Sequence, residues 1–228
     1  MEKTIISIQD LINKKLKKEK DEREHKNQDS WHASSIGNCL RGQYIQRLGI
    51  VKEEPLTERD LRVFSVGRQM EEWVISCLKD IPGIKTETQV RIEDKTIGVS
   101  GYADVVIRDL NRVYEIKTKH SRAFWHMEKS KKPMRQHEYQ LWLYLKILNI
   151  PEGIIVYLSK DDMAIGEYVV KLDDAELEKE VMERINLLNR AWEEKNILLL
   201  PLPKEVDWQA KYCRVHKYCK NPELLNKI

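Results

Sequence analysis

The sequence predicts an α/β fold whose core runs in the order α-β-β-β-α-β, with a helical region before it and a cysteine-containing tail after it. Two β-rich segments, 102–107 and 112–117, flank a polar segment at 108–111 that is typical of a turn. Long segments with helically spaced apolar residues lie on both sides of this pair. With 228 residues, of which 41% are hydrophobic, the chain is long enough to bury one core.

The N-terminal part is expected to be helical. A highly charged helix is predicted over residues 7–26. Ser34 or Ser35 is expected to cap a second helix that ends near residue 48. After a loop at Pro55, Thr57 is expected to begin a third helix that ends near residue 80.

The remainder of the chain alternates strands and helices. Asp173 or Asp174 is expected to cap a long helix that reaches about residue 195, before a proline-containing tail. The expected strands are 85–93, 98–107, 112–118, 153–158 and 166–171, and the expected helices between them are 121–130 and 134–149. We expect residues 1–30 to form a charged helical extension and residues 31–228 a single domain, in which 201–228 fold back toward Cys39.

Charge and hydropathy restrict the classes of partner. The formal net charge is only +3, so any affinity for nucleic acid has to come from local basic clusters. No apolar run approaches the roughly 18 to 20 residues of a membrane span, so no membrane partner is expected. The chain shows no signal peptide and is rich in lysine, which indicates a cytoplasmic, intracellular protein.

The predicted hairpin brings two carboxylates together. If it is symmetric about residues 109 and 110, then Asp104 faces Glu115. Cβ atoms of opposed residues lie about 4.5 to 5.5 Å apart, so these carboxylates repel each other unless a cation lies between them. Lys117 returns to the same face of the strand as Glu115. The alternative is an exposed, charged strand tip.

This trio is typical of a divalent-metal site for phosphodiester hydrolysis. Mg²⁺ or Mn²⁺ prefers oxygen ligands, which the two carboxylates and the backbone carbonyl of Ile116 would supply. A bound metal activates water and stabilises charge on a phosphate, while the Lys117 ammonium group can orient the nucleophile. No covalent intermediate is required.

Three ordered motifs resemble the RecB-like branch of the PD-(D/E)XK nuclease superfamily: Gly101-Tyr-Ala-Asp104, Glu115-Ile-Lys117, and Gln140-Leu-Trp-Leu-Tyr144. The resemblance implies the restriction-endonuclease-like core and a catalytic set of Asp104, Glu115, Lys117, Gln140 and Tyr144. Gln140 and Tyr144 would lie one helical turn apart and position substrate beside the active site. The alternative is an amphipathic helix with an ordinary surface glutamine.

A further metal ligand is implied by the helix before the strands. Gly67 falls where the family has a helix carrying a glycine, and where many members have a histidine four residues later this chain has Glu71. A carboxylate binds a hard metal at least as readily as imidazole does. Glu72 is a neighbouring competitor, and both could instead belong to a solvated helix face.

The cysteines carry a second resemblance. The segment around Cys39 is similar to the N-terminal cysteine element of small CRISPR-associated RecB-like exonucleases and AddB-type nuclease domains. That resemblance implies an iron–sulfur cluster held by one early cysteine and a late Cys-x-x-Cys-x5-Cys group. Cys213 and Cys219 supply the last pair, whereas position 210 is alanine.

Three alternatives remain for this group. An iron–sulfur cluster, or a zinc ion, would be held by Cys39, Cys213, Cys219 and His216, with Cys77 as a less favoured fourth ligand. In the third alternative the thiols are merely packed and there is no centre. Cys77 lies in an apolar helical segment and is expected to be a small buried hydrophobe.

A basic segment precedes the helix that carries Gln140. Trp125 could stack on unpaired bases, and the nearby cations could bind backbone phosphates. The alternative is a solvated loop beside a core tryptophan. The candidate DNA-binding residues are Trp125, Lys129, Lys131, Lys132 and Arg135.

We therefore expect a divalent-metal-dependent DNA nuclease, most simply an exonuclease that acts on single strands or duplex ends. The expected partners are DNA and CRISPR-adaptation, recombination or helicase proteins. The alternative from another class is a noncatalytic DNA-end-binding protein or CRISPR-adaptation partner. A restriction-type endonuclease is a third possibility, although the sequence shows no surface that would read bases.

Overall fold

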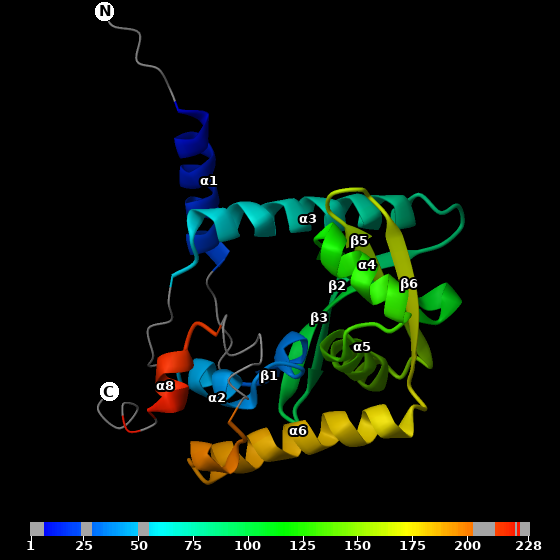
Figure 1. Cartoon of the computed structure of the whole chain (residues 1–228). Coiled ribbons are helices and arrows are strands. Elements are labelled where there is room, and N and C mark those ends of the chain that lie inside the picture. Colours follow the sequence, from blue (N-terminus) through cyan, green and yellow to red (C-terminus); the bar gives the residue numbers. More distant parts are fainter. Residues whose placement is uncertain (1–6, 24–28, 50–54, 203–212, 222, 224–228) are drawn as a thin grey trace, which may run out of the picture.

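The computed structural model describes residues 7–23, 29–49, 55–202, 213–221 and 223, and its centre is one mixed β-sheet with helices on both faces (Figure 1). The sheet order is β1 (Trp31–His32), β3 (Val99–Ile107), β4 (Arg112–Lys119), β5 (Glu152–Ser159), β6 (Ile165–Lys171). Strand β2 (Thr86–Asp94) pairs with the other edge of β3. This architecture confirms the predicted α/β class.

The connections give the predicted order of elements. Helix α3 (Glu58–Lys79) leads into the antiparallel strands β2, β3 and β4. Helices α4 (Ser121–Ser130) and α5 (Arg135–Leu148) then form the crossover to β5, which runs parallel to β4. Parallel neighbours require such a crossover, usually helical. Strand β6 returns antiparallel to β5, and α6 (Ala175–Glu193) follows it.

Strands β3 and β4 separate from each other partway along their length. Their pairs run from Ile107 with Arg112 to Val105 with Tyr114. Beyond that point β4 continues to pair with β5 as far as Lys119. On the edge that faced β4, the next pair of β3 is the one between Ser100 and β1. The paired strands therefore open into a fork beside Asp104.

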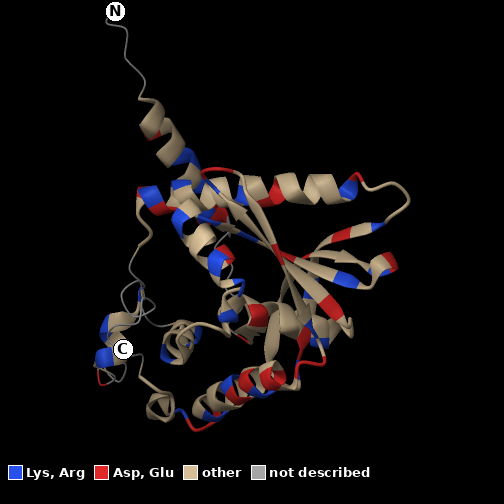
Figure 2. Cartoon of the chain, turned by 45° about the vertical axis from the view of Figure 1, so that its right-hand side comes forward, with Lys and Arg blue, Asp and Glu red and all other residues tan. Residues whose placement is uncertain are grey.

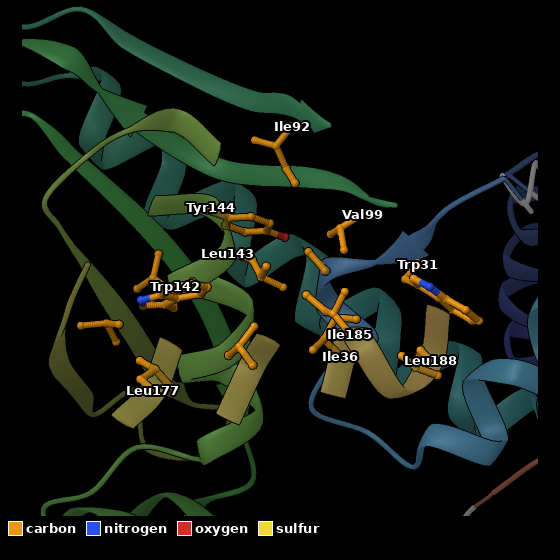
Figure 3. Packing of buried hydrophobic residues seen from close by; sticks show 14 of the residues in the cluster. Trp31, Ile36, Ile92, Val99, Trp142, Leu143, Tyr144, Leu177, Ile185 and Leu188 are labelled. Carbon is orange, nitrogen blue, oxygen red and sulfur yellow. The ribbon is translucent and has the colours of Figure 1, made fainter. Parts of the chain in front are cut away.

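Two apolar clusters hold the sheet between its helices. On one face, α5 and α6 pack in a large core in which Trp142, Leu143 and Tyr144 of α5 are 0 to 1% exposed (Figure 3). On the other face, Met70 and Ile75 of α3 pack against a smaller cluster from the strands. Burial of one such large side chain contributes about 1.5 to 3 kcal/mol. The fork is thus fixed from both faces.

The start of α2 (Leu40–Leu48) differs from the prediction. Ser34 and Ser35 do not cap it; they lie in the short 3₁₀ helix η1 (Ala33–Ser35), and α2 begins after Cys39. Tertiary packing explains the difference, because a Cβ atom at Gly37 would lie 2.3 Å from the backbone of Gln136 in α5. The chain follows this contact instead of the local capping signal.

Other predicted boundaries agree with the structure to within one or two residues. Thr57 forms a capping box at the start of α3, and Asp174 caps α6 by accepting a hydrogen bond from Leu177 N. The predicted first helix is observed as α1 (Ile8–Arg23), while its expected residues 24–26 lie outside the described residues. The two-residue strand β1 and the 3₁₀ helices η2 (Arg108–Leu110) and η3 (Ile197–Leu199) were not predicted.

The two ends of the described chain pack on different elements. Helix α1 lies against α3, whereas α8 (His216–Lys220) lies beside α2 (Figure 1). The Arg41 guanidinium donates from Nε to Leu200 O at 2.8 Å and from Nη1 to Cys219 O at 3.5 Å. In the described part of the chain no helix is long and apolar enough to cross a membrane.

Candidate active site

The strand fork brings Asp104, Glu115 and Lys117 together. Glu115 is completely buried, and its Oε1 accepts hydrogen bonds from Lys117 Nζ at 2.5 Å and from Gln140 Nε2 at 2.7 Å. The Asp104 carboxylate accepts a hydrogen bond from the backbone N–H of Ile116 through Oδ2, at 2.8 Å.

The hairpin register explains this arrangement. Val106 pairs with Val113, as the predicted symmetry requires, and continuation of the register places Asp104 opposite Glu115. The turn between the strands is η2, closed by Asn111, which has a left-handed φ of 50°. The backbone N–H of Ile116 donates to the Asp104 carboxylate, so this side-chain hydrogen bond replaces a backbone hydrogen bond between β3 and β4.

The electrostatics of the site are dominated by buried negative charge. Burial, followed by the repulsion of Asp104, raises the pKa of Glu115 to about 8 and that of Glu71 to about 7. Burial also raises the pKa of Asp104. For Lys117, burial alone would lower the pKa, but attraction by Glu115, Asp104 and Glu71 outweighs it, so the pKa is raised. One ammonium group therefore faces three carboxylates.

The donor set suits a hard divalent cation. Glu115 Oε2 is buried and has no hydrogen-bond partner among the described residues. The carboxylates of Glu71 and Asp104 and the carbonyl of Ile116 are oxygen donors of the kind that Mg²⁺ and Mn²⁺ prefer. No three His, Cys, Asp or Glu side chains in the described ranges already stand in a metal-holding arrangement. Instead, Lys117 pairs with the Glu115 carboxylate, and the Ile116 amide donates to the Asp104 carboxylate.

Helix α5 supports Glu115 from behind. Gln140 Nε2 donates both to Glu115 Oε1 and to the Tyr144 hydroxyl oxygen, each at 2.7 Å. Gln140 is 4% exposed and Tyr144 is 1% exposed. The spacing of one helical turn brings the two residues to one face, as the sequence predicted. Tyr144 is joined to the site through Gln140.

The structure distinguishes Glu71 from its neighbour Glu72. Burial and the charge of Asp104 raise the pKa of Glu71, and Glu71 accepts a hydrogen bond from Gln89 Nε2 at 3.2 Å. Both glutamates line the groove between α3 and β2, but Glu72 is exposed and also lines the groove shared with α1. Sequence reasoning missed Gln89, which stands in no motif.

The cysteine group gathers at the contact between α2 and α8. A Cβ atom on Gly42 would lie 3.7 Å from both Cys213 Sγ and Cys39 Cβ. A hydrogen bond from Cys219 lowers the pKa of Cys39 to about 6. His216 Nδ1 is buried without a hydrogen-bond partner in the described chain. The donor types therefore fit a thiolate-bound metal centre.

Cys77 does not join this group. It lies on α3 and is exposed, so the expectation that it is a buried hydrophobe is wrong. The buried positions of α3 are Met70 and Ile75, whereas Cys77, near the C-terminal end of that helix, is exposed.

The predicted DNA-binding residues differ in their exposure and in their ion pairs. Trp125 is 53% exposed on a shallow surface of α4 and donates from Nε1 to Asp162 Oδ2 at 2.7 Å. Lys129 lines the same surface, and Lys131 pairs with Glu128 at 2.9 Å. Arg135 is held by Glu180 at 2.7 Å and also contacts Glu138, so its charge is already matched.

Comparison with known proteins finds similarity to exonucleases. No family model matches it. Over 139 residues the chain is 28% identical to the CRISPR-associated exonuclease Cas4 of Saccharolobus solfataricus. The matched segment covers 60% of this chain and 59% of that protein. The chain thus spans less than two thirds of the length of this curated relative.

Two solved structures share the fold. The crystal structure of SSO0001 matches with a TM-score of 0.60 and 23% identity, covering 95% of this chain and 97% of that one. The alkaline exonuclease LHK-Exo of Laribacter hongkongensis matches with a TM-score of 0.55 and 19% identity, covering 73% and 91%. At these identities the likeness concerns the fold. Taken with the sequence match, it confirms the expected resemblance to nucleases: the chain is homologous to Cas4 and shares the fold of an alkaline exonuclease.

Proposed function

We propose that the chain is a divalent-metal-dependent nuclease that hydrolyses phosphodiester bonds in DNA, acting as an exonuclease on single strands or duplex ends. The observation that carries the proposal is the fully buried Glu115, which shares a strand fork with Asp104 and Lys117. The likeness to an exonuclease over more than half of the chain supports it.

Each residue of the site has a proposed part. Glu71, Asp104, Glu115 and the Ile116 carbonyl would hold Mg²⁺ or Mn²⁺. Such a cation activates water and stabilises charge on a phosphate. Lys117, once released from Glu115, would orient the attacking water and neutralise charge on the phosphate. Gln140 would hold the Glu115 carboxylate in a single orientation, and Tyr144 would fix Gln140.

We propose single-stranded DNA as the ligand of the α4 surface. This helix follows directly from β4, which carries Glu115 and Lys117. Trp125 would stack on a base, while Lys129, Lys131 and Lys132 would bind phosphates. A solved structure of LHK-Exo contains dAMP, which supports a deoxynucleotide as the product class. The likeness to Cas4 favours CRISPR-adaptation proteins as partners over recombination or helicase proteins.

We propose that residues 31–228 form one domain whose C-terminal part is held to α2 by a metal centre. The ligands would be Cys39, Cys213, Cys219 and His216. The cysteine-rich set suits an iron–sulfur cluster, with zinc as the alternative metal. The centre would act structurally, because metal binding to such a site adds to folding stability.

End-labelled DNA tests the proposed activity. Linear single-stranded, linear duplex and circular single-stranded DNA are incubated with the protein and Mg²⁺ or Mn²⁺, with and without chelator. We expect shortening of the linear substrates only, and only with the metal. Glu115→Gln and Lys117→Ala should slow cleavage by about a hundredfold or more. Glu167→Gln, an exposed carboxylate of β6, serves as the control.

Wild-type cleavage that persists in excess chelator would contradict a metal-dependent mechanism. Binding of DNA ends without cleavage in every metal would favour the noncatalytic alternative. Cutting of circular DNA at the same rate would identify an endonuclease.

A further inference from the structure

Strand β2 contains one residue with an unusual backbone. Gln89 has a φ of 50°, in the left-handed region that non-glycine residues rarely adopt. The other non-glycine residues with positive φ in the described chain follow a helix or lie in a turn; they are Asn111, Lys131, Asn149, Met163 and Lys195. Gln89 is the member of this set that lies inside a strand.

The strain at Gln89 has no explanation in the packing of its own side chain. Gln89 is exposed, so burial does not force its conformation. Left-handed backbone at a non-glycine residue costs of order 1 kcal/mol or more and concentrates at functional sites. An exposed strand residue without a function would relax to the extended conformation of its neighbours.

The register shows what Gln89 faces. The ladder between β2 and β3 passes from Thr88 with Val105 to Val90 with Ala103, which leaves Gln89 opposite Asp104. On the other side of β3, Asp104 lies opposite Glu115. Gln89, Asp104 and Glu115 therefore form one row across three neighbouring strands.

The side-chain amide of Gln89 binds one of the three carboxylates, and Gln89 lies opposite a second. Its Nε2 donates to Glu71 Oε1 at 3.2 Å, which joins β2 to α3. On the neighbouring strand β3, the register places Asp104 directly across from Gln89. An amide nitrogen carries two N–H groups, so one side chain can serve both carboxylates.

An amide has an advantage over a charged donor at this point. Glu71, Asp104 and Glu115 must stay near one another while their net charge remains negative enough to attract a cation. A second lysine would neutralise that charge, whereas a neutral amide leaves it unchanged. Gln89 and Glu71 also line a groove of about 590 Å³ between α3 and β2, which gives solutes access to Glu71.

We propose that Gln89 is a positioning residue for the metal site: its amide holds the Glu71 and Asp104 carboxylates in the orientation that receives a divalent cation, and the left-handed backbone directs the amide there. The inference rests on the proposed metal-dependent function. It assigns to β2 a role that none of the sequence motifs contains.

Substitution by glycine separates this role from a structural one. Gln89→Gly removes the amide but tolerates the left-handed backbone, and Gln89→Asn keeps an amide on a side chain shorter by one methylene. Met163→Gly is a matched control, because Met163 is exposed with a φ of 59° in the turn between β5 and β6. Full-length variants are titrated with Mn²⁺ by calorimetry, and their melting temperatures are measured in chelator.

We expect Gln89→Gly to melt at or above the wild-type temperature and to bind Mn²⁺ about 10-fold to 100-fold more weakly. Gln89→Asn should also bind Mn²⁺ more weakly, and Met163→Gly should retain the wild-type affinity. DNA cleavage by Gln89→Gly should fall at low Mn²⁺ and recover at saturating Mn²⁺.

Two results would overturn the inference in distinguishable ways. If the wild-type chain binds Mn²⁺ and Gln89→Gly binds it equally well, Gln89 has no positioning role, although the proposed function stands. If the wild-type chain neither binds Mn²⁺ nor cleaves DNA, the proposed function fails, and the role of Gln89 fails with it.

Discussion

At the scale of single residues, the site combines groups that are unfavourable alone. A buried carboxylate without compensation costs several kcal/mol. Glu115 is compensated on one oxygen by Lys117 and Gln140, while the other oxygen has no partner in the described chain. The raised pKa of Glu115, about 8, expresses that incomplete compensation. Such arrangements are common where function, and not stability, fixes the residue.

His137 gives a prediction about pH. It is 7% exposed on α5, its Nδ1 lies 2.7 Å from the Tyr157 hydroxyl, and burial, followed by Lys117 and Lys119, lowers its pKa to about 2. Below about pH 6.5 the unfolded chain binds a proton at this residue and the folded chain does not. Protonation of His137 therefore does not affect the free energy of unfolding above pH 6.5. Below pH 6.5 it lowers the free energy of unfolding progressively, as the pH falls toward 2. At about 1.4 kcal/mol per pH unit, some 2 kcal/mol is lost by pH 5.

Urea unfolding at pH 7.5, 6 and 5 in chelator measures this effect. We expect His137→Gln to lose less unfolding free energy between pH 7.5 and 5 than the wild type does, by about 2 kcal/mol. His126→Gln, on the exposed side of α4, is the control and should follow the wild type. Equal pH dependence in all three proteins would show that His137 is not kept neutral by the fold.

The sequence predicts some site residues and not others, for physical reasons. Asp104, Glu115 and Lys117 follow from strand alternation and hairpin symmetry, which are local properties. The choice of Glu71 over Glu72 depends on how α3 rotates against the sheet, which no local signal specifies. Gln89 depends on a backbone angle that only the assembled sheet determines.

At the scale of elements, boundaries were predictable where a cap is local. The capping box at Thr57 satisfies backbone groups within one turn of α3 and is visible in the sequence. The start of α2 depends instead on contacts made across the molecule: Arg184 of α6 donates from Nε to Ile36 O at 2.6 Å. These two residues are 148 positions apart in the sequence, so local helix propensity cannot predict their contact.

The joint between α2 and α8 carries a prediction about the cysteines. If Cys39, Cys213 and Cys219 share a metal, Cys213→Ser and Cys219→Ser should lower both metal content and melting temperature, because the ligands then hold α8 less firmly. Cys77→Ser, exposed on α3, should change neither. Iron and zinc analysis, visible absorbance after anaerobic purification, and calorimetry provide the measurements.

An opposite result would assign the group to packing. Wild-type protein that contains neither iron nor zinc, together with an unchanged melting temperature in Cys213→Ser, would leave only packed thiols. The alanine at position 210 lies outside the described residues, so the structure does not place the position of the expected third late cysteine.

At the scale of the whole molecule, lysine and arginine are interspersed with acidic residues along the helices and strands (Figure 2). Helix α1 follows the same pattern, because its lysines at 14, 15, 17, 18 and 20 are accompanied by Asp10, Glu19, Asp21 and Glu22. A net charge of +3 gives little long-range attraction for DNA, so the proposed DNA binding would have to depend on local groups beside the fork. The surface of α4 is the nearest candidate, because it continues from the strand that carries Lys117.

The proposed DNA-binding role of α4 predicts a change in the salt dependence of DNA binding. Lys129→Ala with Lys132→Ala should weaken single-stranded DNA binding equally for all sequences. The log-log salt slope should flatten by about 0.7 for each phosphate that the variant no longer neutralises. Trp125→Ala should cost about 1 to 3 kcal/mol for a stacked base. Binding is measured with fluorescent DNA and Ca²⁺, which suppresses cleavage.

The matched control removes two cations from α6, as Lys179→Ala with Arg190→Ala, both of which are exposed. This variant should keep the wild-type affinity and slope. If the α4 variant shows the same slope and affinity as this control, DNA binds elsewhere on the molecule.

The central claim is that the fork between β3 and β4 is a divalent-metal site, and anomalous diffraction from a crystal soaked in Mn²⁺ tests it most directly. We predict an anomalous peak bonded to the Asp104 and Glu115 carboxylates, with Lys117 Nζ displaced from Glu115 Oε1. A crystal saturated with Mn²⁺ that shows no peak at the fork, while Lys117 remains on Glu115, would contradict the claim.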